Sequence, residues 1–161
     1  MKITFIQTGG TIDKDYPHTT KGWAFEIGEP AVTRILQKLD PSFDFEVITA
    51  FRKDSLEITD EDRASLAELI NKLESTKIII THGTDTMIET ASCLDHEVKD
   101  KLIVITGAVR PEKFSDSEAP INLGSAIATA NLKDKGVYIA MHGIVKPYDK
   151  IQRNVNTGKF Y

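Results

Sequence analysis

The sequence of 161 residues has only one cysteine, Cys93, so no disulfide can form within the chain. It also has no apolar run of the roughly 18 residues that a membrane span needs. The N-terminal MKITFIQTGGT is broken by glycines, unlike the apolar core of a signal peptide. We therefore expect a cytoplasmic protein with no membrane partner. Apolar neighbours at helical spacing favour a buried structural thiol for Cys93 over a nucleophile.

Basic residues are too few for a protein that tracks phosphates. The 20 Lys and Arg residues stand against 24 Asp and Glu residues, the net charge is -4, and there is no basic run. The four histidines are scattered, and no cluster of His, Cys and carboxylates has the spacing of metal ligands. The glycines match neither a Walker loop nor the dinucleotide fingerprint. We expect no nucleic-acid partner, no metal and no cofactor.

What the sequence does have is an alternation of short apolar runs and helix-period segments, which is typical of a parallel sheet with crossover helices. Five strands are predicted, at residues 3–8, 45–51, 77–81, 102–106 and 137–141. Four helices are predicted: one from 31 to 39 behind Pro30, one through 66–73 behind a capping box of Thr59 and Asp62, one at 84–98 and one at 120–132. Residues 142–161 contain no predicted element.

The predicted fold class is α/β, with a three-layer arrangement of a mostly parallel five-stranded sheet and helices on both faces, Rossmann-like or flavodoxin-like. The length fits a single domain over residues 1–161. Because crossover connections are right-handed, the carboxyl ends of the strands lie along one edge, where such sheets bind ligands. The functional site is expected there.

Hydroxyls, glycines and carboxylates follow four of the predicted strands: Thr8-Gly9-Gly10-Thr11, Lys53-Asp54-Ser55, Thr81-His82-Gly83-Thr84-Asp85 and Gly107-Ala108. Paired glycines let the backbone approach a bound group and leave amide N–H groups free to face an oxyanion. Threonine hydroxyls are candidate nucleophiles that need a neighbouring base or cation.

Each of these strings also has a structural interpretation. The glycine pair is a common tight turn, and Thr84 and Asp85 are good N-cap residues for the helix that follows. His82 is a candidate base, although a lone histidine near a turn is more often a hydrogen-bonded structural residue.

In combination the strings are much more specific. Thr8-Gly9-Gly10-Thr11-Ile12 behind an N-terminal strand, followed by Thr81-His82-Gly83-Thr84-Asp85-Thr86 and Glu89-Thr90, closely resembles the two signatures of the bacterial-type asparaginases and glutaminases. Further matching strings are Ser55 ahead of an acidic residue, and Thr106-Gly107-Ala108-Val109-Arg110-Pro111. The resemblance covers almost the whole chain in the right order.

The resemblance implies a role for each matching residue. Thr11 is the nucleophile that attacks the side-chain amide and forms an acyl-enzyme. Thr84 is a second catalytic hydroxyl, and Asp85 binds the substrate's amino group or orients the activating cation. The resemblance further implies that Ser55 and Asp54 hold the substrate's α-carboxylate and α-amino ends, and that the backbone at Gly10, Gly83 and Ala108 shapes the amide pocket.

Two positions depart from the family pattern. The family's activating lysine aligns with Arg153, which stabilises an alkoxide but cannot act as a base; Lys150 is the alternative. The family's assisting tyrosine aligns with Phe25, which has no hydroxyl, so Tyr16 of the same loop is the candidate. Residues 13–28 have the length and composition of a mobile lid, or else of an ordinary surface loop.

The family likeness is to its N-terminal domain, and the second, smaller domain of the family is missing, so the chain resembles a short form or a fragment. The implied function is hydrolysis of L-asparagine to L-aspartate and ammonia, with L-glutamine as a second candidate substrate. A homo-oligomer is implied by analogy. The alternatives are a binding or regulatory protein on the same fold, which Arg153 favours, and the ammonia-releasing subunit of a tRNA-dependent amidotransferase, which would require an extra N-terminal domain.

Overall fold

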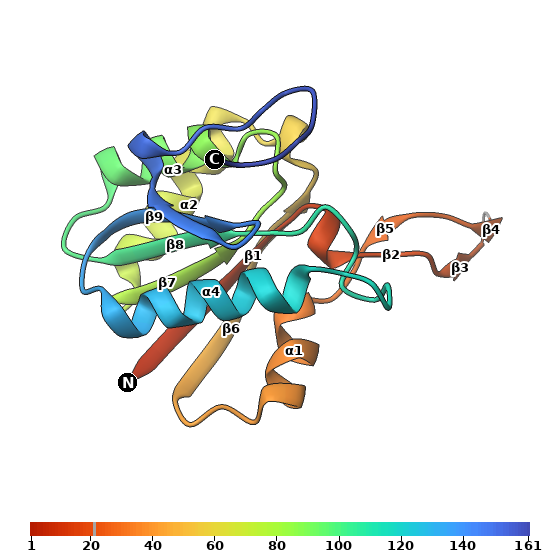
Figure 1. Ribbon diagram of the computed structural model, residues 1–161, viewed down its shortest axis with the longest axis horizontal. Helices are drawn as coiled ribbons and strands as arrows, with labels where there is room; N and C mark the ends of the chain where they lie inside the picture. The colour runs from red at the N-terminus through yellow and green to blue at the C-terminus, as the bar shows by residue number, and fades with distance from the viewer. Residues whose placement is uncertain (21) are drawn as a thin grey trace.

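The computed structural model describes residues 1–20 and 22–161, and its centre is a six-stranded sheet in the order β10-β9-β8-β7-β1-β6 (Figure 1). Five of these strands are parallel: β1 (Lys2–Gly9), β6 (Asp44–Lys53), β7 (Lys77–Thr81), β8 (Leu102–Thr106) and β9 (Gly136–Met141). All five were predicted, with small shifts at their ends. Their carboxyl ends therefore share one edge of the sheet.

The sixth strand, β10 (Ile144–Pro147), runs antiparallel to β9 and was not predicted. Its register pairs Ile144 with Met141, which leaves a two-residue turn of His142 and Gly143. Both turn residues have positive φ, at 53° and 80°, as the favoured two-residue hairpin turn requires. The prediction that residues 142–161 hold no element is therefore wrong, since a hairpin strand and a short 3-10 helix (Tyr148–Lys150) lie there.

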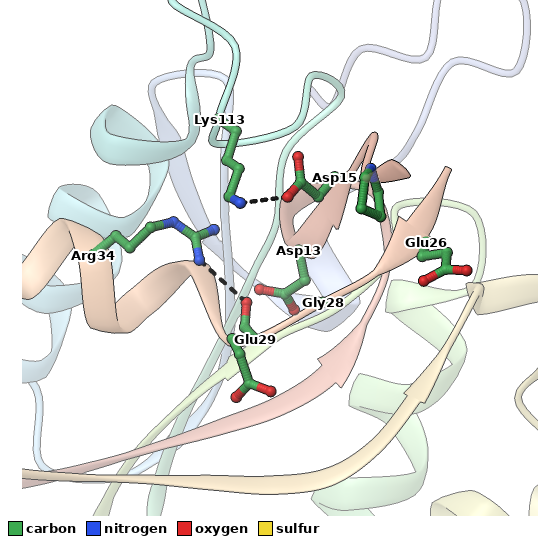
Figure 2. A pocket seen from close by; sticks show the side chains of 8 residues that line it. Asp13, Asp15, Glu26, Gly28, Glu29, Arg34 and Lys113 are labelled. Atoms are coloured by element: carbon green, nitrogen blue, oxygen red, sulfur yellow. Dashed lines mark hydrogen bonds and ion pairs between the residues drawn. The ribbon is translucent and has the colours of Figure 1, made fainter. Parts of the chain in front are cut away.

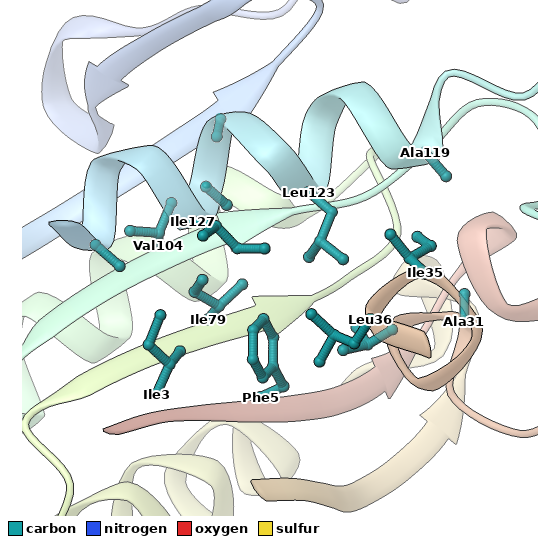
Figure 3. Packing of buried hydrophobic residues seen from close by; sticks show 14 of the residues in the cluster. Ile3, Phe5, Ala31, Ile35, Leu36, Ile79, Val104, Ala119, Leu123 and Ile127 are labelled. Atoms are coloured by element: carbon teal, nitrogen blue, oxygen red, sulfur yellow. The ribbon is translucent and has the colours of Figure 1, made fainter. Parts of the chain in front are cut away.

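Two helices cover each face of the sheet, which confirms the three-layer α/β fold (Figure 1). On one face α1 (Ala31–Leu39) and α4 (Ala119–Leu132) pack over alternate strand residues such as Ile3, Phe5 and Val104 (Figure 3). On the other, α2 (Asp60–Lys72) and α3 (Met87–Glu97) pack over residues such as Ile6 and Ile80. Because both faces are covered, the middle strands β7 and β8 are apolar except at their ends. The neighbouring β1 also buries the polar residues Thr4, Gln7 and Thr8.

The helix ends mostly follow the sequence signals. Thr59 accepts a hydrogen bond from the Asp62 N–H, and the Asp62 side chain accepts one from the Thr59 N–H, as the predicted capping box requires. The third helix, however, begins at Met87 and not at Thr84. Within residues 1–20 and 22–161, no helix is long and apolar enough to cross a membrane.

An arm whose described residues are 14–20 and 22–27 projects from the body at the end of β1 (Figure 1). It contains two short ladders: β2 (Lys14–Asp15) pairs with β5 (Glu26–Ile27), and β3 (His18–Thr19) pairs with β4 (Gly22–Trp23). Its aromatic side chains Tyr16, Trp23 and Phe25 are exposed, Trp23 to 63%. The arm forms most of the loop predicted as a lid; Lys21 lies outside the described residues.

Candidate functional site

Three loops meet at the carboxyl edge of the sheet, at Gly10, Gly83 and Ser55. Gly10 has φ 83°, and a Cβ added there would lie 2.5 Å from the Gly83 Cα. A Cβ on Gly83 would lie 2.7 Å from the Ser55 Cβ. Side chains at either glycine would push these loops apart, so the contact depends on both glycines.

The two candidate nucleophilic residues, Thr11 and Thr84, directly follow the two glycines of this contact. Thr11 directly follows Gly10, is half-buried, and opens a short 3-10 helix (Thr11–Asp13). Thr84 directly follows Gly83 and is also half-buried. The Gly10 N–H donates to the Lys53 carbonyl over 3.0 Å, which fixes the end of β1 against the end of β6. Thr11 and Thr84 therefore lie on adjacent, contacting loops.

Ser55 is buried and holds the loop that contains Thr84 and Asp85. Its Oγ accepts the Asp85 N–H over 3.2 Å, and its carbonyl accepts the Thr86 hydroxyl over 2.7 Å. The N-cap of α3 is Thr86, so the N-cap interpretation of Thr84 and Asp85 is wrong. The two hydrogen bonds to Ser55 keep Thr84 and Asp85 outside the helix. Ser55 retains its own hydroxyl proton for a further acceptor.

Arg153 lies against Asp85, with its Nη1 3.0 Å from the Asp85 Oδ1. The segment after β10 returns to the sheet edge, where Arg153 forms a backbone bridge with Phe160. Lys150, the alternative cation, is exposed and pairs with its neighbour Asp149 over 3.2 Å. The Arg153 Nε is buried and has no hydrogen-bond partner in the described part of the chain. The structure thus brings Arg153 to the site and leaves Lys150 at the surface.

The other predicted residues lie at different depths. Ala108 is buried at the end of β8, beside Gly107, whose carbonyl accepts the Asn122 amide over 2.9 Å. Asp54 is half-exposed and its carboxylate lies 2.9 Å from the Lys14 Nζ. A substrate ammonium at Asp54 would therefore compete with Lys14.

Tyr16 lies on the arm. Its ring stacks at 6.0 Å from Trp23 and tilts at 5.1 Å from Phe25, and its side chain is exposed. Phe25 also lies 6.3 Å from Phe114, which joins the arm to the loop before α4. The structure thus places Tyr16 in an aromatic cluster of the arm, and a role beside Thr11 requires the arm to move.

His82 is fully buried and bonded on both ring nitrogens. Nδ1 lies 2.7 Å from the Gly83 carbonyl and must donate to it, so in the neutral ring Nε2 accepts the Thr90 hydroxyl over 2.9 Å. Burial lowers the pKa of His82 to about 4. The ring is neutral at pH 7 and holds the Gly83 loop, which fits the structural interpretation. Cys93 is only partly buried, and burial raises the pKa of its thiol.

Sequence reasoning missed Asp13, a buried carboxylate two residues after Thr11. Its Oδ1 accepts the Ala31 N–H over 2.7 Å, and burial raises the pKa of the carboxyl group to about 6. Asp13 lines a cavity of about 350 Å³ at the base of the arm (Figure 2). In the sequence the run Asp13-Lys14-Asp15 is typical of a solvated surface, so nothing in it indicated burial.

Metal ligation has little support in this geometry. Within the described ranges 1–20 and 22–161, no group of three or more His, Cys, Asp and Glu side chains is arranged to hold a metal ion.

Comparisons with known proteins identify relatives of this fold and site. The family described as "Asparaginase, N-terminal" matches residues 2–158. A glutaminase-asparaginase of Acinetobacter glutaminasificans is 32% identical over 165 residues, which cover 96% of this chain and 50% of the relative. The solved structure of the thermostable L-asparaginase from Thermococcus kodakarensis superposes with a TM-score of 0.84 at 26% identity, and covers 100% of this chain and 51% of that one.

A shorter match is to a component of the glutamyl-tRNA(Gln) amidotransferase of Methanococcus vannielii. It is 45% identical over 67 residues, which cover 41% of this chain and 16% of the relative. The chain thus spans about half the length of the relatives that match it from end to end.

Proposed function

Because the chain belongs to the asparaginase family, matching its N-terminal domain, we propose that it hydrolyses the side-chain amide of L-asparagine to L-aspartate and ammonia with Thr11 as the nucleophile. L-Glutamine is the second candidate substrate. The observation that carries this proposal is the contact between the Gly10 and Gly83 loops, because the first loop continues into Thr11 and the second into Thr84 and Asp85. Arg153 pairs with Asp85 of the second loop.

In the proposed reaction the Thr11 Oγ attacks the amide carbon and its proton passes through water to Asp85. The tetrahedral oxyanion is stabilised by backbone N–H groups near Gly10, Gly83 and Ala108. The proton then moves to the amide nitrogen, the C–N bond breaks, and ammonia leaves an acyl-Thr11 ester. Water hydrolyses the ester and restores the Thr11 hydroxyl.

Arg153 serves this reaction as a fixed positive charge. A guanidinium keeps its proton at any working pH, so it favours the alkoxide of Thr11 or Thr84 but accepts no proton. Its Nε is buried and has no hydrogen-bond partner among residues 1–20 and 22–161. Slow hydrolysis is expected, because a family lysine would also act as a base.

Recognition of the substrate's backbone is assigned to Ser55 and Asp54. The unused Ser55 hydroxyl proton suits a carboxylate, and Asp54 suits an ammonium group. In the same proposal the arm closes over the bound amide and brings the Tyr16 hydroxyl towards Thr11, which shields the reacting amide from bulk solvent during the first step. Such a movement would break the contacts of the arm with the loop before α4, which are the Lys113–Asp15 ion pair and the ring contact of Phe25 with Phe114.

An amino-acid sensor that does not turn over its ligand is the alternative, and the Arg153–Asp85 pair favours it because an arginine stands where the family resemblance gives a lysine. The match to an amidotransferase component covers too little of the chain to favour that function. Ammonia release from L-asparagine at high protein concentration separates the first two. We expect slow release that disappears in Thr11→Ala. Asparagine binding without ammonia release above the Thr11→Ala background would refute the proposal that the protein is an enzyme.

A homo-oligomer is proposed as well, paired through the outer face of α4. This helix has no charged side chain in fourteen residues, yet Ile121 and Leu132 are 67% and 82% exposed. With Ser125 and Ala128 between them, they form one stripe in the order large, small, small, large. A second copy lying antiparallel repeats the same order, as a twofold interface requires.

The proposed pairing rests on this apolar stripe alone, because the acidic side chains before α4, Asp116 and Glu118, already pair with Arg110. Light scattering should give a dimer for the wild type and a monomer for Ile121→Glu, while the control Leu39→Glu on α1 stays dimeric. A monomeric wild type would refute this pairing.

The cytoplasmic location is also a proposal, and cell fractionation tests it.

A further inference from the structure

Asp13 is the buried carboxylate closest in sequence to Thr11, and none of the proposed chemical steps uses it. It ends the 3-10 turn that Thr11 begins. Its side chain points between the base of the arm and the start of α1, near Gly28 and Glu29 (Figure 2). The same residue therefore belongs to the turn of the nucleophile and to the junction where the arm returns to the body.

Four hydrogen bonds of Asp13 join separate parts of the chain. Its N–H donates to the Gly10 carbonyl over 3.2 Å, and its carbonyl accepts the Gly28 N–H over 2.9 Å. Its Oδ1 accepts the Ala31 N–H over 2.7 Å, and its Oδ2 lies 3.4 Å from the Thr81 hydroxyl. Through these bonds the Thr11 turn is fastened to the arm's end, to α1 and to β7.

The bond to Ala31 is the one that depends on the side chain most strongly. Ala31 is the first residue of α1, and its N–H has no acceptor within the helix. A side-chain oxygen of Asp13 satisfies this buried donor, and a charged one also benefits from the helix N-terminus. Removing the oxygen would leave the donor unpaired and free the turn to shift.

We propose that Asp13 is a positioning residue for Thr11. Its side-chain oxygen binds the first turn of α1 and so holds in place the turn that carries the nucleophile. This inference rests on the proposed function, since it takes Thr11 as the attacking group. A displacement of about 1 Å at a nucleophile lowers a rate by up to roughly 100-fold while leaving binding little changed. The expected signature is therefore a loss in kcat with a small change in KM.

Two substitutions at Asp13 test the oxygen itself. Asp13→Ala removes the acceptor, and kcat for asparagine should fall about 10-fold to 100-fold with KM within about threefold. Asp13→Asn keeps an amide oxygen for the Ala31 N–H and should recover most of kcat. If Asp13→Ala does not fold, Asp13→Val, which fills more of the space and has no acceptor, takes its place. An Asn variant that loses as much kcat as Ala, or an Ala variant that loses none, overturns the proposal.

Glu112 offers a matched control, because it is a second buried carboxylate bound to α1. Its Oε2 accepts the Arg34 Nε–H over 2.6 Å. Its backbone N–H donates to the Ile12 carbonyl of the Thr11 turn over 3.1 Å, and a side-chain substitution keeps this bond. Glu112→Ala should loosen α1 and keep kcat within about threefold. An equal loss of kcat in Glu112→Ala and Asp13→Ala would mean that α1 alone matters, and would overturn the positioning role.

Amide hydrogen exchange tests the anchor without any catalysis. The Lys14, Gly28 and Ala31 N–H groups each donate to an oxygen of this turn. They should exchange faster in Asp13→Ala than in Asp13→Asn or Glu112→Ala. If these three amides exchange at the wild-type rate in Asp13→Ala, the proposed anchoring by Asp13 is wrong, even when the enzyme is active. Faster exchange in a protein that hydrolyses no amide supports the anchor and refutes the proposed function instead.

Discussion

The guanidinium of Arg153 and the carboxylate of Asp85 form an ion pair of 3.0 Å that joins the loop after β7 to the segment after β10. The pair places a permanent positive charge beside Thr84 and Asp85, in the position that the family resemblance gives to a lysine. Arg153 itself supplies charge and orientation but cannot act as a base. The rate of hydrolysis therefore depends on whether the positive charge of Arg153 alone is enough to activate the Thr11 hydroxyl.

Arg153→Lys should raise the rate of asparagine hydrolysis by about 10-fold or more, because a lysine also transfers protons. The rate of this variant should increase with pH as the ammonium loses its proton, whereas the wild type has no such limb from Arg153. Initial rates of ammonia release across a pH series from neutral to alkaline measure both effects. Lys150→Ala serves as the control and should match the wild type; a fall in that variant alone would move the activator to Lys150.

Gly83→Ala should abolish activity and destabilise the fold by about 1–3 kcal/mol, since the new Cβ overlaps Ser55. Urea unfolding and ammonia release measure the two losses. Gly124→Ala is the matched control: a Cβ there meets nothing within 4 Å, and alanine favours the helix by about 0.5–1 kcal/mol. A Gly83→Ala protein that keeps wild-type activity would contradict the close contact of the loops.

The buried His82 should make the protein less stable in acid. Its pKa is about 4 in the fold against an ordinary value of 6.5, so the unfolded chain binds more protons between these pH values. The contribution of His82 to the free energy of unfolding is fully present above pH 6.5, and it falls by about 3 kcal/mol as the pH drops to 4. In His82→Asn this loss should be absent. Urea unfolding at a series of pH values tests it; parallel curves for the two proteins would contradict the assignment.

Asp13 should act in the opposite direction over nearly the same range. Its pKa is about 6 in the fold against an ordinary value of 3.8, so the folded state binds more protons between them. Stability from this group is highest below pH 3.8 and falls by about 3 kcal/mol as the pH rises to 6. The free-energy difference between Asp13→Asn and the wild type should therefore grow with pH in favour of the variant. A difference that stays constant across this pH range would show that Asp13 is not buried.

The apolar runs and the capping box of Thr59 were enough to predict five strands, four helices and their layers. β10 was missed because Ile144–Pro147 is short and ends in proline, although the His142-Gly143 pair between two apolar segments is a hairpin signal. The start of α3 was predicted too early, because the tether from Ser55 to Asp85 and Thr86 comes from a distant strand. Local patterns do not contain that information.

The strand-end residues Gly10, Gly83 and Ser55 were predicted together, since parallel strands end at one edge. Arg153 was reached only through the family resemblance, and the structure adds the hairpin that returns it to Asp85. Asp13 had no signal at all. A carboxylate in a charged run becomes a buried anchor only when α1 and the arm close around it, which is a property of tertiary packing.

The arm has one more consequence, for how unfolding is observed. Trp23 is the single tryptophan of the sequence and stands on the arm, in ring contact with His18 and Tyr16. Intrinsic tryptophan emission will therefore report on the arm and not on the sheet. Fluorescence melts of this protein would report arm detachment as if it were global unfolding, so circular dichroism is the optical signal to use for the core.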